Sequence, residues 1–231
     1  MFFENYKTKI CPFQRWSSSL ICDILISMDG KIDCIVVGPI ETNCWLYPLE
    51  TETDEARPCI VIDPGENVNR IINRLKELNW VPRYIFATHG HYDHVTALPA
   101  LLEACRNGAF GQASSPQVGI HKGDVHHLDI EPDILFEEGD VFGPFKVLHI
   151  PGHTQGCVAF LDEKAGVIFT GDTLFKGDWG RTDLPGGNEQ QIYQSLRRLL
   201  SLREDLIVLP GHGPTSTIKQ EVLSNPDLVR G

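Results

Sequence analysis

The sequence predicts an α/β fold, a four-layer αββα sandwich, and two observations support this fold class. Short apolar runs alternate with segments whose apolar residues recur at helical spacing. The chain also divides into two halves, each with its own strands and helices, which suits two sheets packed face to face with helices outside. Periodicity alone does not single out the sandwich among α/β folds.

The length and charge of the chain limit the classes of function. The chain has 231 residues, enough for one large domain or two small ones. We expect residues 1–31 to form an extension or an added hairpin and residues 32–231 to form the main domain. The formal net charge of −11 argues against nucleic acid and anionic membrane surfaces as partners, since both select for clustered Lys and Arg. No apolar run is long enough to span a bilayer. The sequence leaves the oligomeric state open.

The cysteines indicate a reducing compartment. They are odd in number, scattered along the chain and never paired as Cys-x-x-Cys. Since no convincing signal peptide precedes them, the pattern is typical of reduced thiols in a cytoplasmic protein. The seven positions are Cys11, Cys22, Cys34, Cys44, Cys59, Cys105 and Cys157.

The N-terminal segment allows two interpretations. Asp29-Gly30 stands between Ile21–Met28 and Lys31–Val37, and its sequence is typical of a two-residue hairpin turn. Alternatively, Met28 is the natural start and the preceding residues are an extension. The alternation of apolar and polar residues on both sides of the turn favours the hairpin.

The first half is expected to begin with strands and to continue into a βαβ unit. The apolar residues of Glu66–Trp80 recur at helical spacing, so we expect this helix to connect the third and fourth strands. A second helix is expected over Val95–Cys105, where Pro99 is tolerated only in the first turn. The expected strands are Ile32–Val37, Asn43–Tyr47, Pro58–Ile62 and Tyr84–Ala87.

The second half is richer in strands. After an expected loop at Asn107–Gln117, a strand and a helical turn are predicted for Val118–His121 and Asp124–Leu128. The last clear helix is Asn188–Leu202, whose apolar residues share one face. The remaining expected strands are Asp140–Val141, Lys146–Ile150, Cys157–Leu161, Val167–Thr170 and Leu206–Leu209.

Four side chains of metal-binding type follow the predicted strand at Tyr84–Ala87. They are His89, His91, Asp93 and His94. Neutral imidazole and carboxylate are ligands that zinc, iron and manganese accept, whereas buried polar groups without partners are costly. With this spacing, the first two histidines can point one way while the aspartate and the third histidine turn toward a neighbouring point. The pattern therefore predicts two neighbouring metal ions.

Three further candidate ligands stand at the ends of predicted strands in the second half. Each follows a short apolar run and has a glycine beside it, which lets the backbone turn sharply and approach closely. These candidates are His153, Asp172 and His212. Any one of them could be an ordinary turn residue, but together with the cluster of the first half they indicate a metal site.

The combined motif resembles the signature of the metallo-β-lactamase superfamily. It consists of Thr88-His89-Gly90-His91-Tyr92-Asp93-His94, followed by His153, Asp172 and His212. The resemblance covers the chain from about Ile32 to the C-terminus and implies the metallo-β-lactamase fold. It implies two divalent metal ions, with zinc as the first choice and iron or manganese as alternatives. One ion would be held by His89, His91 and His153, the other by Asp93, His94 and His212, with Asp172 as the bridge.

Two stretches narrow the resemblance within the superfamily. Leu174–Asp183 resembles the loop of glyoxalase II-like hydrolases and of persulfide dioxygenases, and Pro210–Thr217 resembles that of small single-domain glyoxalase II-like hydrolases. A bridging Asp172 distinguishes the chain from zinc β-lactamases, and His91 distinguishes it from flavodiiron proteins. The stretch after the last histidine, Gly213–Gly231, is too short for the helical domain that supplies much of the glutathione site in full-length glyoxalase II.

The function implied by the resemblance is a binuclear hydrolase of thioesters, of the S-lactoylglutathione type. A water shared by the two metals would ionise near neutral pH, and the hydroxide would attack the thioester carbonyl. The thiolate product, with a free pKa of about 8.5, is a good leaving group that needs little help from a general acid. Asp93 and Asp172 are the candidate catalytic carboxylates, and Asp172 would hold the metals in register.

Two residues outside the ligand set have candidate roles. Arg181 could bind a substrate carboxylate; the alternative is a structural ion pair with Asp178 or Asp183. Asp63, at a predicted strand end, is the candidate for orienting a ligand histidine.

Other functions compatible with the motif differ in class. A mononuclear iron persulfide dioxygenase would use His89, His153 and Asp172, a triad that suits non-haem iron. The hydrolase-like sequence around His212 favours hydrolysis over this alternative. The acidic charge disfavours a nucleic-acid-processing enzyme, and the completeness of both ligand sets disfavours a non-catalytic metal-binding domain.

Overall fold

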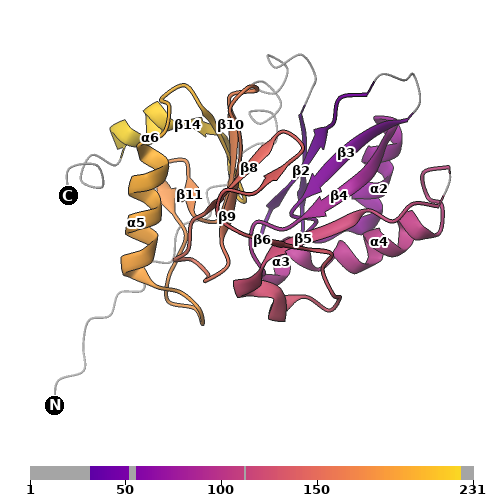
Figure 1. Ribbon diagram of the computed structural model, residues 1–231, viewed down its shortest axis with the longest axis horizontal. Helices are drawn as coiled ribbons and strands as arrows, with labels where there is room; N and C mark the ends of the chain where they lie inside the picture. Colours follow the sequence, from indigo (N-terminus) through magenta and orange to yellow (C-terminus); the bar gives the residue numbers. More distant parts are fainter. Residues whose placement is uncertain (1–31, 52–55, 112, 225–231) are drawn as a thin grey trace.

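Two mixed sheets form the centre of the protein. The computed structural model describes residues 32–51, 56–111 and 113–224, and within these ranges each of the two sheets has six strands. The sheets face each other, and helices cover the outer face of each, so that the layers run helix, sheet, sheet, helix (Figure 1). The four-layer αββα sandwich that the sequence predicts is confirmed. The predicted hairpin turn at Asp29-Gly30 lies outside the described residues.

The first sheet has its strands in sequence order. The antiparallel strands β1, β2 and β3 are followed by β4, β5 and β6, which all run parallel to β3. Because Ile62 at the end of β3 pairs with Phe86 at the end of β4, the loops that follow these two strands leave the same edge. The strands are β1 Asp33–Val37, β2 Thr42–Pro48, β3 Arg57–Ile62, β4 Trp80–Phe86, β5 Gln117–His121 and β6 Ile134–Phe136.

The second sheet brings the two later ligand-bearing loops together. Its order is β14-β13-β10-β9-β8-β7, with β10 and β13 parallel and the other neighbours antiparallel. Gly171 pairs with Pro210, so the residues that follow these two strands emerge side by side. The strands are β7 Val141–Phe142, β8 Phe145–His149, β9 Val158–Asp162, β10 Val167–Gly171, β13 Ile207–Pro210 and β14 Ser216–Thr217. A separate hairpin consists of β11 Leu174–Phe175 and β12 Asp178–Trp179.

Each sheet is covered by helices through their apolar faces. Ile71 and Leu75 of α2 and Leu101 of α4 are buried in a cluster with residues of the first sheet. Leu196 and Leu199 of α5 pack in the same way against the second sheet. The helices are α2 Val68–Glu77, α3 Tyr92–Val95, α4 Leu98–Arg106, the 3₁₀ helix η2 Lys122–His127, α5 Glu189–Leu200 and α6 Ile218–Ser224.

The space between the sheets is filled largely by aromatic side chains. Phe160 on β9 is fully buried, and its ring centroid lies 5.4 Å from that of Phe86, 5.3 Å from that of Phe136 and 5.8 Å from that of Phe145. Edge-to-face and tilted ring pairs of this kind add to the gain from burial. The layer fixes the distance between the sheets, and so the distance between the loops at their edges.

Truncation of Phe160 is expected to destabilise the whole fold. Phe160→Ala would leave a cavity between the sheets and lower the free energy of unfolding by about 3–5 kcal/mol. Urea unfolding monitored by circular dichroism measures this loss. As a control, Val141→Ala removes a side chain that is 68% exposed, and its effect should stay within about 0.5 kcal/mol. Equal midpoints for the two variants would contradict the prediction.

The structure corrects two predicted helix boundaries. Trp80 is the first residue of β4 and not the last of the helix, because Asn79 adopts a positive φ of 55° that ends α2 and turns the chain. Of the helix predicted for Val95–Cys105, Val95 ends α3, and α4 begins only at Leu98; Pro99 lies in the first turn of α4, as the sequence requires. Four short strands and α6 were not predicted.

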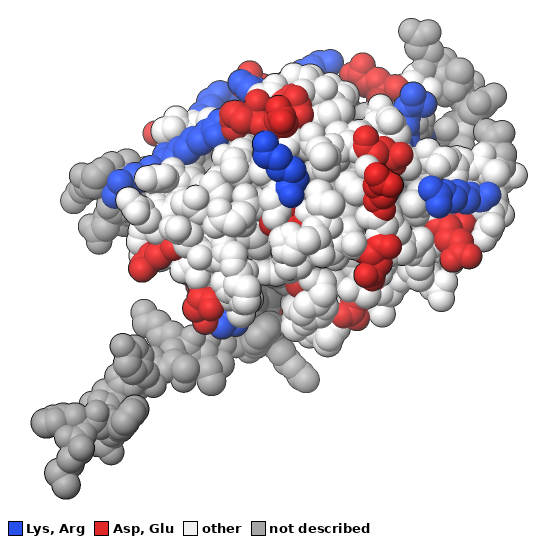
Figure 2. Space-filling view, turned by 60° about the horizontal axis from the view of Figure 1, so that its bottom comes forward, with Lys and Arg blue, Asp and Glu red and all other residues white. Residues whose placement is uncertain are grey.

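The surface carries mixed charge. On the face in Figure 2, acidic and basic side chains of the described residues are interspersed. Among the helices in the described part of the chain, none has the length and apolarity needed to cross a bilayer.

Candidate metal centre

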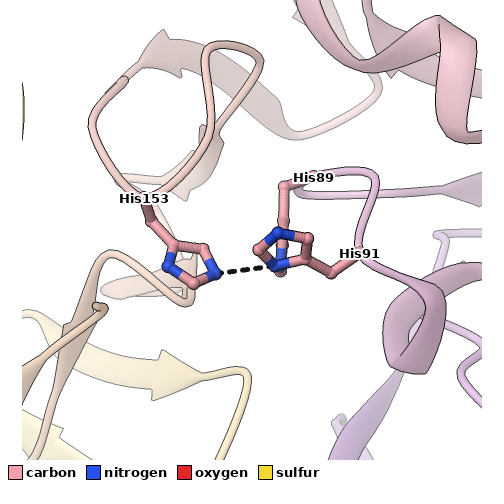
Figure 3. A group of neighbouring side chains, drawn as sticks. All are labelled: His89, His91 and His153. Carbon is pink, nitrogen blue, oxygen red and sulfur yellow. Dashed lines mark hydrogen bonds between the residues drawn. The ribbon is translucent and has the colours of Figure 1, made fainter. Parts of the chain in front are cut away.

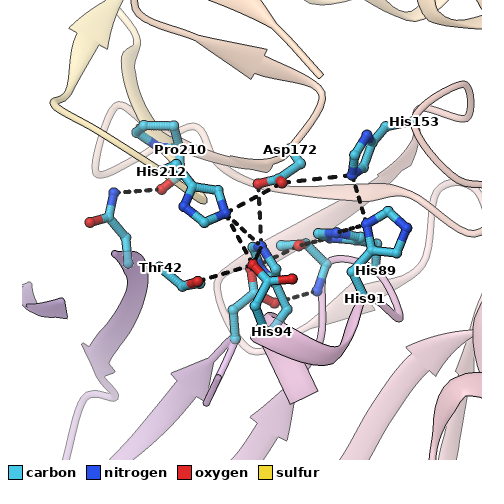
Figure 4. Close-up of polar contacts among 12 residues, drawn as sticks. Thr42, His89, His91, His94, His153, Asp172, Pro210 and His212 are labelled. Carbon is cyan, nitrogen blue, oxygen red and sulfur yellow. Dashed lines mark hydrogen bonds and ion pairs between the residues drawn. The ribbon is translucent and has the colours of Figure 1, made fainter. Parts of the chain in front are cut away.

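The seven predicted ligands converge at one edge of the sandwich (Figure 4). Those of the first half come from the loop after β4 and from α3. Those of the second half follow β8, β10 and β13, one from each loop. The centre is therefore built from both sheets. The described residues place these side chains in three groups: His89, His91 and His153; His89, His94 and Asp172; Asp93, His94 and His212.

The first group consists of three histidine rings whose nitrogens face one another (Figure 3). Nδ1 of His91 lies 3.1 Å from Nε2 of His89 and 2.9 Å from Nε2 of His153. Neutral imidazoles cannot satisfy three converging nitrogens by hydrogen bonds alone, because each contact needs one donor and one acceptor. A cation accepts all three lone pairs.

Asp93, His94 and His212, called the second group from here on, combine two histidines with a carboxylate. Nε2 of His212 lies 3.1 Å from Oδ2 of Asp93 and 3.4 Å from Nε2 of His94. His94 Nε2 is also 3.3 Å from the same carboxylate oxygen. Two nitrogens and one oxygen thus surround a point next to the first group.

Asp172 lies between the groups. Its Oδ1 is 3.3 Å from Nε2 of His94, and its Oδ2 is 3.6 Å from Nε2 of His153 and 3.5 Å from Nε2 of His212. The carboxylate is buried, and Oδ1 has no hydrogen-bond partner among the described residues. A buried carboxylate oxygen without a donor is costly unless a cation binds it. This position suits a bridge between two ions.

The outer nitrogens of three rings fix which nitrogen faces the centre. Nδ1 of His153 donates to the carbonyl oxygen of Arg181 at 2.7 Å, and Nδ1 of His212 donates to that of Ile40 at 3.0 Å. Nδ1 of His94 lies 3.0 Å from Oδ2 of Asp63. Since the two carbonyl acceptors place a proton on Nδ1 of His153 and of His212, Nε2 is the nitrogen of these rings that is available to a metal.

The ionisation of the side chains also suits a divalent cation. Burial and the neighbouring imidazoles lower the pKa of His89 well below its usual value and that of His91 to about 4, so both rings are neutral at pH 7. Burial raises the pKa of Asp93, but the contacts with His212 and His94 together outweigh it and hold that pKa well below the usual range. Burial likewise opposes the ionisation of Asp172, yet the nearby His94 and His212 lower its pKa. At the second group, burial lowers the pKa of His94 and His212, but Asp172 and the other carboxylates outweigh it and raise the pKa of both rings. A cation bound there would displace these protons, as metal binding to histidine generally does.

Asp63 lies beneath the second group, as predicted for a residue that orients a ligand. It is buried at the end of β3 in the left-handed conformation, with φ of 54°. Its Oδ1 accepts a hydrogen bond from the Thr88 amide at 2.7 Å and its Oδ2 accepts one from Thr88 Oγ1 at 2.8 Å, next to the contact with His94. One carboxylate therefore fixes both the start of the histidine loop and a ring of the second group.

Asp63→Asn is expected to weaken metal binding to the second group. The amide keeps the shape of the side chain but places an NH₂ group against a donor, either Thr88 or His94. We expect the affinity of the second group to fall by roughly 10- to 100-fold. Titration of demetallated protein with zinc against a chromophoric chelator measures this change, and unaltered affinities for both ions would contradict it.

The sequence does not reveal the role of Thr42 beside the centre. Its Oγ1 donates to Oδ2 of Asp93 at 3.0 Å, and its backbone forms a β-bridge with His212. The next residue, Asn43, donates through Nδ2 to the carbonyl oxygen of Pro210 at 3.0 Å. The start of β2 thereby ties the last ligand loop to the first sheet. Its position after the Gly38-Pro39 turn gave no signal of this role, because the partner lies far along the chain.

Arg181 has two contacts of different kinds. Its guanidinium pairs with Asp183, with Nε 2.6 Å from Oδ1 and Nη2 2.6 Å from Oδ2, and the side chain is exposed. Its backbone oxygen holds His153, as described above. The ion pair that the sequence allowed as the alternative is thus present, and the loop lies beside the first group.

Comparisons with known proteins agree with this geometry. Residues 37–212 match the family profile of the Metallo-beta-lactamase superfamily. The chain is 36% identical over 212 residues to a protein of Haemophilus influenzae named hydroxyacylglutathione hydrolase GloC, an alignment that covers 86% of this chain and 98% of that protein.

Two solved structures are similar in sequence and in fold. The B3 metallo-beta-lactamase BLEG-1 is 32% identical, with a TM-score of 0.74 and coverage of 87% of this chain and 100% of its own. TTHA1623, solved in a di-iron-bound form, is 34% identical, with a TM-score of 0.71 and coverage of 84% of this chain and 99% of its own. The histidine and aspartate groups described above are consistent with a binuclear metal site.

Proposed function

Since this chain belongs to the metallo-β-lactamase superfamily, we propose that it is a binuclear hydrolase of thioesters of the S-lactoylglutathione type. The observation that carries the proposal is the buried Asp172 carboxylate between two three-residue ligand groups. The similarity to a hydroxyacylglutathione hydrolase along almost its whole length supports the substrate class. The proposed ligands are His89, His91 and His153 for one ion and Asp93, His94 and His212 for the other, with Asp172 shared.

The residues of the centre would position the reaction. Two divalent ions bound here would activate a water and polarise the thioester carbonyl. Asp93 and Asp172 stay ionised and hold the two groups at a fixed separation. The hydrogen bonds from Nδ1 of His153 and of His212 to backbone carbonyl oxygens keep the Nε2 atoms of these rings directed inward. The centre offers no carboxyl group free to act as a general acid among the described residues, which suits a thiolate leaving group with a pKa of about 8.5.

The substrate would approach from the side of His91 and His212. These two ligands are partly exposed, whereas His89 and His94 are fully buried. Tyr92, which stands between His91 and Asp93 in the sequence, is 64% exposed. An exposed aromatic ring beside the centre is a suitable surface for the acyl or thiol part of a substrate.

The test combines metal analysis with three substrates. We expect about two ions per chain in the purified protein and cleavage of S-lactoylglutathione that is lost on chelation. A chromogenic cephalosporin tests for β-lactamase activity, which the similarity to BLEG-1 makes the specific competitor. Oxygen uptake with glutathione persulfide tests for the dioxygenase. A single iron with oxygen uptake and no thioester cleavage would overturn the proposal, as would cleavage of the β-lactam alone.

Arg181 is proposed to bind a carboxylate of the thiol carrier. Arg181→Ala should raise KM about fivefold and leave kcat unchanged, since an exposed charge pair contributes about 1 kcal/mol and acts on binding. The matched control is Arg203→Ala, because Arg203 makes the same kind of pair with Asp205 two residues on, at 2.6 Å, and lies outside the centre. Equal KM values for the two variants would assign Arg181 to a structural role only.

A further inference from the structure

Asp124 is a buried carboxylate beside the centre that belongs to none of the three ligand groups. It lies in η2, the short helix that follows β5, and is 1% exposed. A buried carboxylate is costly unless several donors satisfy it. Its donors therefore indicate what it holds in place.

The donors come from two loops that belong to different sheets. Oδ2 of Asp124 accepts hydrogen bonds from the amide of Gly90 at 2.9 Å and from Oγ1 of Thr154 at 2.6 Å. Oδ1 accepts one from the amide of Gly156 at 2.9 Å. Gly90 stands between His89 and His91, and Thr154 directly follows His153.

The two glycines are required by the closeness of this contact. A Cβ atom at Gly156 would lie 2.5 Å from Cγ of Asp124, and one at Gly90 would lie 2.8 Å from His127 and 3.0 Å from Cβ of Asp124, both residues of η2. Any larger residue would push the loop away from the carboxylate. The backbone on both sides is thus fitted to Asp124.

We propose that Asp124 is a positioning residue for the first ligand group. By bonding both loops, it sets the distance between the pair His89 and His91 on one sheet and His153 on the other. This inference rests on the proposed metal centre. Among the described residues, the hydrogen bonds of Asp124 reach these two loops, whereas Asp63 contacts His94 of the second group and Thr88 at the start of the histidine loop. Asp124 is therefore the carboxylate that joins the two loops of the first group.

The experiment measures metal affinity separately at each group. In a His212→Ala background, the remaining ion is held by the first group, and Asp124→Asn should weaken its binding by roughly 10- to 100-fold. In a His153→Ala background, the remaining ion is held by the second group, and the same substitution should leave its affinity unchanged. Zinc titration of demetallated protein against a chromophoric chelator gives both values without any assay of thioester cleavage.

Controls separate this role from a general loss of stability. Asp162→Asn removes a matched buried carboxylate that accepts from Tyr47 Oη at 2.5 Å and from the Ala165 amide at 2.9 Å, at the far end of β9; it should leave both affinities unchanged. Thr154→Val should weaken the first group alone, and Thr154→Ser should restore it. These two variants decide the matter if Asp124→Asn does not fold.

Two results would overturn the inference. Equal weakening of both groups would make Asp124 a residue of general stability. Unchanged binding at the first group would show that Asp124 does not position it. If neither single-group background binds zinc, the proposed centre fails together with this inference, whereas failure of the thioester assay alone would leave the inference standing.

Discussion

Asp172→Ala is expected to lower kcat by roughly 10³-fold or more and to reduce the metal content from about two ions per chain to about one. The carboxylate lies between the two ligand groups, with its oxygens facing His94, His153 and His212. Without the Asp172 carboxylate, the centre loses a negative charge that would compensate the charge of a second cation. Steady-state kinetics and elemental analysis on the same preparation measure both effects.

Asp172→Asn separates charge from shape at this position. The amide fills the same space but donates hydrogen bonds where the carboxylate accepts, so the second ion should still be lost. We expect its kcat to lie close to that of the alanine variant. Near wild-type turnover with two ions in either variant would refute the assignment of Asp172 as the bridge.

Gly211→Ala is expected to disrupt the centre with a single methyl group. Gly211 is buried, and a Cβ atom there would lie 2.2 Å from Oδ1 of Asp172 and 2.6 Å from Cε1 of His94. The φ of Gly211 is not in the left-handed region, so the backbone conformation itself admits alanine. The methyl group must therefore displace the bridge or the ring. Since a displacement of about 1 Å costs about 100-fold in rate, we expect a loss of kcat of at least that size.

The matched control for this variant is Gly139→Ala. Gly139 has a φ of 85° and no atom within 4 Å of the added Cβ, so its substitution strains the backbone without touching any ligand. It should lower the free energy of unfolding by about 1 kcal/mol and leave kcat and metal content unchanged. Equal activities of the two alanine variants would contradict the steric argument.

The parts of the fold that the sequence predicts are those with a strong local pattern. The βαβ unit was predicted because α2 repeats its apolar residues every three or four positions and because β3 and β4 are short apolar runs. The strands that were missed, such as β6 and β11, have two or three residues, too few to show a period. The break between α3 and α4 follows from backbone geometry after the ligand turn, which periodicity does not encode.

The ligand cluster could be predicted more fully than its supports. Histidine and aspartate next to glycine at strand ends are visible as a motif, and the structure brings all seven together. The role of Asp63 could be predicted too, since this residue also stands at a strand end. The roles of Thr42 and Asp124 could not, because an isolated threonine or aspartate in a loop is ordinary and their partners are 51 and about 30 residues away. Only the folded chain shows which donors such residues meet.

The origin of the ligands in both sheets has a consequence for the order of assembly. Asp93 and His212 meet although they are 119 positions apart in the sequence. His212 follows strand β13, which pairs with β10. The chain between these two strands contains α5. Domains begin to fold from the N-terminus during synthesis, and distant strand pairing is slow. The first sheet and its histidine loop can therefore form on the ribosome well before the second group is complete. A nascent chain with only the first sheet folded would hold His89 and His91 of the first group and Asp93 and His94 of the second, with neither group complete. Metal uptake at both groups therefore marks the end of folding and does not start it.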